Sequence, residues 1–169
     1  FAIFALILGM ISPSIIFGLV LQVAFFFVPS QKALAVTDTI TVSGTWIAPA
    51  GVTSVSVEVW GGGGGGGGQN LASDGGGGGG GGAYSKLNSF TTVPANGYVV
   101  TVGTGGAGGS DGCGGTGLDS NFVNATTVMA KGGIGGCNST GTPPAGGLGG
   151  AAASGVGDTK FSGGQGEIG

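Results

Sequence analysis

The sequence predicts an all-β domain in which antiparallel strands alternate with left-handed helices of the polyglycine-II type. Three observations predict this class. The chain has two uninterrupted runs of eight glycines, at 61–68 and 75–82. Stretches with the alternation of β-strands enter the first run and leave the second. No stretch after residue 35 has the period of an α-helix, although an apolar helix is expected before that point.

The amino-terminal residues 1–28 are apolar and carry no charged side chain. At about 1.5 Å per residue a helix of this length would reach across a bilayer. Pro13 interrupts it and leaves residues 15–28 as one apolar stretch, a length typical of a signal peptide. The sequence therefore predicts either a signal peptide or, through residues 1–29, an uncleaved membrane anchor.

A cleavage site follows this segment. Ala33-Leu34-Ala35 has the small-x-small pattern of a signal cleavage site, with Ala33 and Ala35 as the small residues. Cleavage would start the mature chain at Val36. Under either interpretation the remainder is exported, so we expect a secreted or cell-surface protein. The predicted divisions are residues 1–35, a glycine-rich β domain at 36–135, and a glycine-rich continuation at 136–169.

The strands are predicted from short alternating stretches. Residues 54–60 are the clearest, because Val55, Val57 and Val59 share one face while polar residues and Trp60 share the other. Turn residues at 49–51 precede this strand, and a turn of the hairpin type is expected at 94–97. Further strands are expected at 39–42 continuing towards Trp46, from 83–87 towards Phe90, and at 98–102, 119–123 and 126–130.

The glycine runs have no side chains to bury and lose much backbone entropy on ordering. One reading is a flexible linker. The other is a polyglycine-II helix with three residues per turn, in which each run reaches roughly 25 Å at about 3.1 Å per residue. Such helices can pair N–H with C=O groups of their neighbours. Because strands flank both runs, the sequence favours ordered helices inside one folded unit.

The charges exclude some classes of function. The 169 residues include four lysines, no arginine and no histidine, and the net charge is −3. A basic face for nucleic acid is therefore not expected. No histidine, paired acids or nucleophile motif indicates catalysis, so we expect neither an enzyme nor a cofactor. Residues 114–119 match the start of a calcium-binding nonapeptide, but solenoids need several repeats, so a turn capped by Asp119 is favoured over a metal site.

The order of motifs resembles a known family. The chain reads SGTWIAPAGV at 43–52, VSVEVWG at 55–61, GAY at 82–84 and YVVTVG at 98–103. This order and spacing resemble the glycine-rich domain of bacterial surface and phage proteins over about residues 37–135. Related architectures occur in phage tail-fibre adhesins and in the glycine-rich region of anaplastic-lymphoma-kinase-type receptors. The resemblance implies a small antiparallel sandwich, jelly-roll-like, with a packed layer of glycine helices used for binding and no shared catalytic residues.

Few side chains are candidates for a site. Cys113 and Cys137 are the only cysteines, and in an exported chain they are expected to form a disulfide, worth roughly 3 kcal/mol, rather than free thiols. Trp46, Trp60 and Tyr84 are possible ligand contacts, although packing across a small sheet is the alternative.

These observations predict a non-enzymatic surface module. The favoured function is adhesion or recognition of a surface protein or carbohydrate through glycine-rich loops. A structural spacer of an envelope or matrix, and the ectodomain of a membrane-anchored receptor, are the alternatives.

Overall fold

The computed structural model describes residues 36–69, 75–138 and 145–169. Residues 39–169 form one compact unit. The predicted signal segment, with Ala33 and Ala35, lies outside the described residues. The described chain forms seven strands and one 3₁₀ turn: β1 (Gly44–Ile47), β2 (Ser54–Trp60), β3 (Tyr84–Thr91), β4 (Gly97–Thr101), β5 (Ser120–Phe122), β6 (Val128–Ala130), η1 (Ala152–Ser154) and β7 (Thr159–Phe161).

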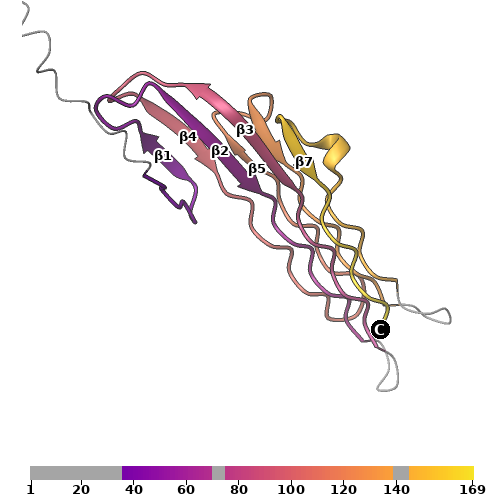
Figure 1. Ribbon diagram of the computed structural model, residues 1–169. Helices are drawn as coiled ribbons and strands as arrows, with labels where there is room; N and C mark the ends of the chain where they lie inside the picture. Colours follow the sequence, from indigo (N-terminus) through magenta and orange to yellow (C-terminus); the bar gives the residue numbers. More distant parts are fainter. Residues whose placement is uncertain (1–35, 70–74, 139–144) are drawn as a thin grey trace, which may run out of the picture. The chain divides into compact units, whose positions relative to one another are not determined.

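The strands form two antiparallel sheets, which confirms the all-β class. One sheet has the order β1-β4-β5-β6 and the other the order β2-β3-β7. Within the unit of residues 39–169 the strands lie at one end, and the glycine segments continue from their ends at the other (Figure 1). The β2 strand has the predicted bounds, and the predicted faces are correct, since Val59 is buried and Glu58 and Trp60 are exposed.

Two predictions about local structure are wrong. The first strand begins at Gly44 and not within 39–42. Its partner β4 ends at Thr101, so no strand remains to pair with earlier residues. There the Ser43 hydroxyl accepts a bond from the amide of Val102 at 2.9 Å instead.

The turn at 94–97 does not close a hairpin. It joins β3 to β4, which belong to different sheets. The β4 strand pairs instead with β1 along Gly97–Val100 and with β5 at Val100 and Thr101, so its partners lie in the other sheet. The turn is fixed to the chain after β1, because the Ala95 amide donates to the Ala48 carbonyl at 2.8 Å.

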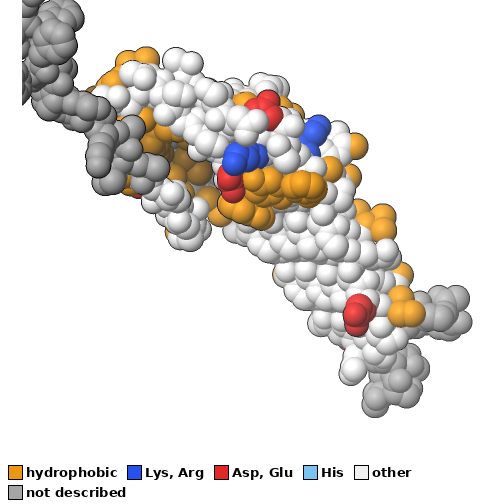
Figure 2. All heavy atoms as spheres, in the orientation of Figure 1, with side chains coloured by type: hydrophobic (Ala, Val, Ile, Leu, Met, Phe, Trp, Pro, Cys, Tyr) orange, Lys and Arg blue, Asp and Glu red, His pale blue; other side chains and the backbone are white. Residues whose placement is uncertain are grey.

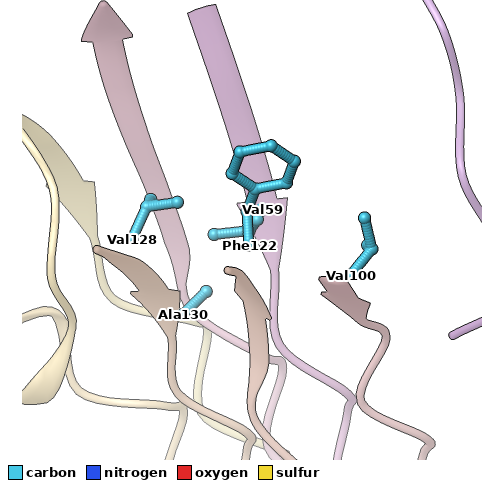
Figure 3. Close-up of a cluster of buried hydrophobic side chains, with 5 residues drawn as sticks. All are labelled: Val59, Val100, Phe122, Val128 and Ala130. Carbon is cyan, nitrogen blue, oxygen red and sulfur yellow. The ribbon is translucent and has the colours of Figure 1, made fainter. Parts of the chain in front are cut away.

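Side chains from both sheets build one small core (Figure 3). Phe122 of β5 lies at its centre, with aromatic contacts to Phe90 of β3 at 5.2 Å and to Tyr98 of β4 at 5.8 Å between ring centroids. The buried cluster contains Val59, Val100, Phe122, Val128 and Ala130. This buried core lies among the strands, and it ends where the glycine segments begin.

The two glycine runs are joined by a ladder of backbone hydrogen bonds with a three-residue repeat. The amide of Gly61 donates to Ala83, and each next bond lies three residues further along both runs. These bonds are Gly61 to Ala83 at 2.9 Å, Gly64 to Gly80 at 2.7 Å and Gly67 to Gly77 at 2.8 Å. The runs are therefore extended, ordered and antiparallel.

Five more segments join this network. The same three-residue repeat links the first run to 112–118 through amides 62, 65 and 68, and the second run to 131–138 through amides 77, 80 and 83. The hydrogen-bond pattern arranges the segments in two layers. The four-segment layer contains 103–110, 61–69, 75–83 and 163–169, and the three-segment layer contains 112–118, 131–138 and 145–150.

Glycine is required where segments face one another. A Cβ atom at Gly64 or Gly65 would come closer than 3.0 Å to the backbone of a neighbouring segment. At the third position, Gly66, the nearest atom would lie 3.7 Å away. Side chains in the other segments occupy such third positions, as in Lys131-Gly-Gly-Ile134-Gly-Gly-Cys137. In that segment residues 131 and 134 are exposed, and the glycines between them are buried.

Candidate functional site

The candidate site is a row of three aromatic side chains on the exposed face of the β2-β3-β7 sheet. Trp60 pairs with Tyr84 across β2 and β3, and Tyr84 pairs with Phe161 across β3 and β7. The ring centroids lie 5.2 Å apart for Trp60 and Tyr84 and 5.9 Å apart for Tyr84 and Phe161. We call these three residues the aromatic row.

The aromatic row is open to solvent. Trp60 is 61% exposed and Phe161 is 62% exposed, while Tyr84 between them is partly buried. Figure 2 shows hydrophobic side chains gathered on this face where β2, β3 and β7 meet the glycine segments, beside positive and negative side chains. Large aromatic side chains that are exposed to solvent at one paired position across three strands form an amphipathic contact surface.

An ion pair lies on the next rung of the same face. The Lys86 ammonium contacts the Glu58 carboxylate at 3.0 Å, and Glu58 and Lys86 are paired in register. The hydrogen bond from Lys86 lowers the pKa of Glu58, and in return Glu58 raises the pKa of Lys86. Desolvation first, and then the Glu58 carboxylate, raise the pKa of Tyr84. Because Glu58 and Tyr84 each affect the pKa of the other, the ion pair and the aromatic row are electrostatically connected.

Trp46 is separated from this row. It lies on β1 and packs with Tyr98 at 6.0 Å and with Phe122 at 6.1 Å between ring centroids, against the core. Of the three predicted contacts, the structure thus brings Trp60 and Tyr84 together and places Trp46 in the packing of the other sheet. Sequence reasoning missed Phe161 as their partner.

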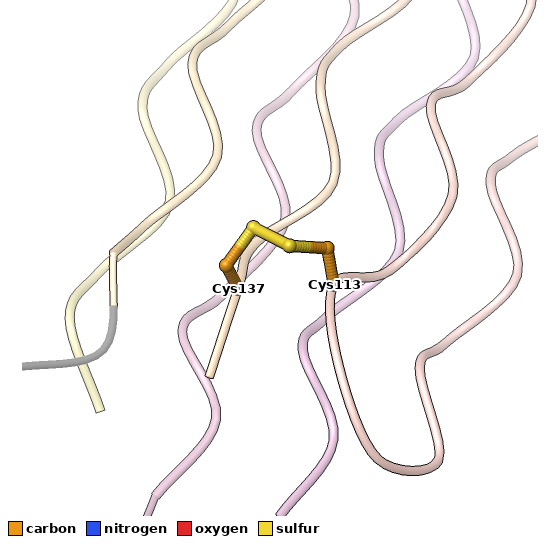
Figure 4. Close-up of a disulfide and its surroundings, with 2 residues drawn as sticks. All are labelled: Cys113 and Cys137. Carbon is orange, nitrogen blue, oxygen red and sulfur yellow. A yellow bond between two sulfur atoms is a disulfide. The ribbon is translucent and has the colours of Figure 1, made fainter. Parts of the chain in front are cut away.

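The disulfide predicted between Cys113 and Cys137 is present (Figure 4). It joins two neighbouring segments of the three-segment layer, where the Gly114 amide also donates to Gly136 at 2.8 Å. The covalent bond therefore fixes the register of two segments that have no hydrophobic core to fix it.

Asp119 has a role that differs from a local turn cap. Its carboxylate accepts from the Lys131 ammonium and from the Gly132 amide, both at 2.9 Å. Burial opposes its ionisation, but these two hydrogen bonds outweigh burial and lower the pKa of Asp119. Within the described ranges no group of three or more His, Cys, Asp or Glu side chains is arranged to hold a metal ion.

Within residues 36–69, 75–138 and 145–169 no helix is long and apolar enough to span a bilayer.

Comparison with known proteins gives one match. Searches of curated proteins and of solved structures returned no significant similarity. The profile of the glycine-rich domain family matches residues 37–169, which extends beyond the region that carries the sequence motifs. This match covers most of the chain, and the chain belongs to the glycine-rich domain family.

Proposed function

We propose that the chain is an exported, non-enzymatic recognition module that binds a surface carbohydrate through the aromatic row. The observation that carries the proposal is the exposed pairing of Trp60, Tyr84 and Phe161 on one rung. A sugar ring is amphipathic, with C–H faces that stack on aromatic rings and hydroxyl groups that need hydrogen-bond partners. Glu58, Lys86 and the Tyr84 hydroxyl supply such partners beside the row.

The scaffold that we propose is a β-sandwich continued by polyglycine-II helices. Contacts of Phe122 with residues of both sheets support the sandwich. The three-residue repeat of hydrogen bonds and side chains supports polyglycine-II helices, since that helix has three residues per turn. A rigid scaffold of this kind would limit the entropy lost when the aromatic row binds a ligand.

Export is part of the proposal. It is supported by the uncharged apolar residues 1–28 and by the Cys113–Cys137 disulfide, which is compatible with an oxidising compartment. Amino-terminal sequencing of the secreted protein should begin at Val36. A protein that remains in the reducing cytoplasm would contradict this part.

A second candidate function is a stiff spacer between surface structures. The continuous hydrogen-bonded glycine segments favour it, because they form an extended array that does not depend on a large core. A spacer needs no exposed aromatic groups, so it leaves the aromatic row unexplained.

Binding to insoluble chitin, cellulose and xylan tests the carbohydrate proposal. Residues 36–169, which contain the compact unit and the family match, are mixed with each polysaccharide, and the protein left in solution is measured. We expect binding to at least one, and Trp60→Ala with Phe161→Ala should raise the dissociation constant about tenfold or more, as for loss of about 1.4 kcal/mol or more.

The matched control is Val93→Ala, because Val93 is as exposed as Trp60 but lies away from the aromatic row. It should bind as the unchanged protein does. Binding to none of the three polysaccharides, or equal loss in the control, would contradict a carbohydrate site. Retention of the fold is checked by the free energy of unfolding of each variant.

A further inference from the structure

One face of the four-segment layer carries no side chain until Gln69 and Glu167, near the ends of their segments. Counting in steps of three from each residue of the aromatic row leads into this face. We call it the bare face, and its residues are Gly63, Gly66, Gly78, Gly81, Gly105, Gly108 and Gly164. Figure 2 shows a broad area without coloured side chains next to the hydrophobic patch. The bare face and the aromatic row therefore share one side of the unit.

Packing within the chain does not explain glycine at five of these positions. A Cβ atom would lie 3.7 Å from its nearest neighbour at Gly63 and Gly66, 3.6 Å at Gly105 and 3.9 Å at Gly108. At Gly164 it would meet nothing within 4 Å. All five residues are exposed. A side chain would fit at each of them, as Gln69 does at the next third position after Gly66.

The opposite side of the bundle shows that third positions can carry side chains. In the three-segment layer they are occupied by residues such as Thr116, Ile134 and Leu148, which point to solvent. The two sides have the same backbone pattern and differ in what fills the third position. Steric tolerance alone would allow side chains on both sides, so absence of side chains from the bare face needs another cause.

The two glycine runs that contribute to the bare face also have unused hydrogen-bond donors. The amides of Gly63, Gly66, Gly79 and Gly82 have no hydrogen-bond partner among the residues that the structure describes. Their neighbours in the same runs donate to an adjacent segment at 2.7–2.9 Å. The carbonyl groups of Gly64, Gly67, Gly79 and Gly82 likewise accept no hydrogen bond from the residues that the structure describes. Such donors and acceptors are complementary to another layer of the same kind.

We propose that the bare face docks against the bare face of a second copy of this chain. Inside the bundle, one glycine layer covers another through such donors and acceptors, so a copy supplies a surface that already packs in this way. The internal pairs run in both directions: Gly64 to Gly80 belongs to an antiparallel pair and Gly106 to Gly63 to a parallel pair. A two-fold related copy can therefore pair with either relative direction of its segments.

Sedimentation equilibrium of residues 36–169 tests this proposal. We expect a dimer with a dissociation constant of about 100 μM or lower. Gly63→Gln with Gly66→Gln should raise the dissociation constant at least tenfold, because the added side chains keep the two faces apart. Glutamine is chosen because Gln69 occupies the following third position of the same segment. Gly164→Gln, on another segment of the bare face, should also raise the dissociation constant of the dimer. It replaces the first variant if that variant does not fold.

The matched control places glutamine at third positions on the opposite side, as Thr116→Gln with Ile134→Gln, and should dimerise normally. A protein that stays monomeric up to about 1 mM would overturn the proposal. So would a dimer that survives both bare-face variants or is lost in the control. Loss of dimerisation without loss of polysaccharide binding separates this result from the proposed recognition function. If the protein is monomeric and its binding to a polysaccharide is lost in Gly63→Gln with Gly66→Gln, the bare face binds carbohydrate and the proposal is overturned.

Discussion

The two ends of the unit are held together by opposite means. At the sheet end, buried side chains such as Phe122 and Val128 fill a core between strands of both sheets. At the glycine end, segments approach so closely that positions such as Gly64 and Gly65 admit no side chain, and backbone hydrogen bonds connect them. The first end is stabilised by what its side chains bury, and the second by the absence of side chains.

This difference shows that hydrophobic content is a poor guide to order in this chain. The glycine segments pay a high entropic cost on ordering, and each hydrogen bond returns only about 1 kcal/mol. Order therefore depends on many bonds forming together in both layers, with the strands fixing where each segment starts. Removing a side chain should damage one end, and adding a side chain should damage the other.

The largest expected effect is at the sheet end. Phe122→Ala removes the ring that contacts Phe90 and Tyr98 and leaves a cavity in a small core. We expect the free energy of unfolding to fall by about 3–5 kcal/mol, measured by urea denaturation. Val93→Ala, at an exposed position, is the control and should change it by less than about 0.5 kcal/mol. A loss of the same small size for Phe122→Ala would show that the core does not hold the sheets.

The converse change is Gly65→Ala at the glycine end. Its added methyl group would come closer than 3.0 Å to the Ala107 carbonyl, and the two backbones are fixed by hydrogen bonds. We expect a loss of about 3 kcal/mol in the free energy of unfolding. The adjacent Gly66→Ala is the matched control, because its Cβ has space. It should be neutral or should stabilise the protein by about 0.5 kcal/mol through the unfolded state. Equal effects at residues 65 and 66 would be inconsistent with the three-residue pattern.

The disulfide is the next test, since it is the covalent link within the glycine end. Cys113→Ser with Cys137→Ser opens a loop whose ends are 24 residues apart. The free energy of unfolding should fall by about 2–3 kcal/mol. The strands and the glycine segments should still unfold in one transition. Reduction of the unchanged protein should give the same loss and is the control. Unchanged stability in both experiments would mean that the bundle keeps its register without the bond.

The smallest effect concerns pH and Asp119. Its pKa is lowered in the folded chain, so its ionised form stabilises the fold at neutral pH. This contribution should disappear as the pH falls below the usual Asp pKa of 3.8 and through the lowered value. A carboxyl titration by NMR measures the pKa, and Lys131→Met should move it upward by removing the first of the two hydrogen bonds. A midpoint at or above the usual value in the unchanged protein would contradict this account.

Much of the sheet end could be predicted from the sequence. The β2 strand is correct in both bounds and faces, because alternation of valine with polar residues is a strong local signal. The β7 strand was missed, since three residues between glycine-rich stretches carry no periodicity, and pairing with β3 decides their conformation. Phe161 was missed as part of the aromatic row for the same reason. The turn at 94–97 has a local hairpin signal that cannot reveal to which sheet each strand belongs.

The glycine end was predicted in outline. The ordering of the two glycine runs and the backbone pairing of neighbours followed from glycine's lack of a side chain. The arrangement of the five other segments in two layers was not predicted. A three-residue spacing of side chains was nevertheless present in Thr104-Gly-Gly-Ala107-Gly-Gly-Ser110 and in the segments starting at Lys131 and Ala145. Side chains there recur every third residue, because one direction in three points away from a neighbouring segment. This spacing is kept only within each short segment, so the chain as a whole has no collagen-type repeat.

The most direct test of the account is amide hydrogen exchange resolved residue by residue through 61–68. The account predicts slow exchange at 61, 62, 64, 65, 67 and 68, whose amides donate to neighbouring segments, and faster exchange at 63 and 66. The measurement is made at a protein concentration below that of dimer formation, so that a second copy does not protect Gly63 and Gly66. This alternation would establish an ordered bundle with a three-residue pattern. Uniform exchange at the rate of an unfolded chain through all eight residues would contradict it.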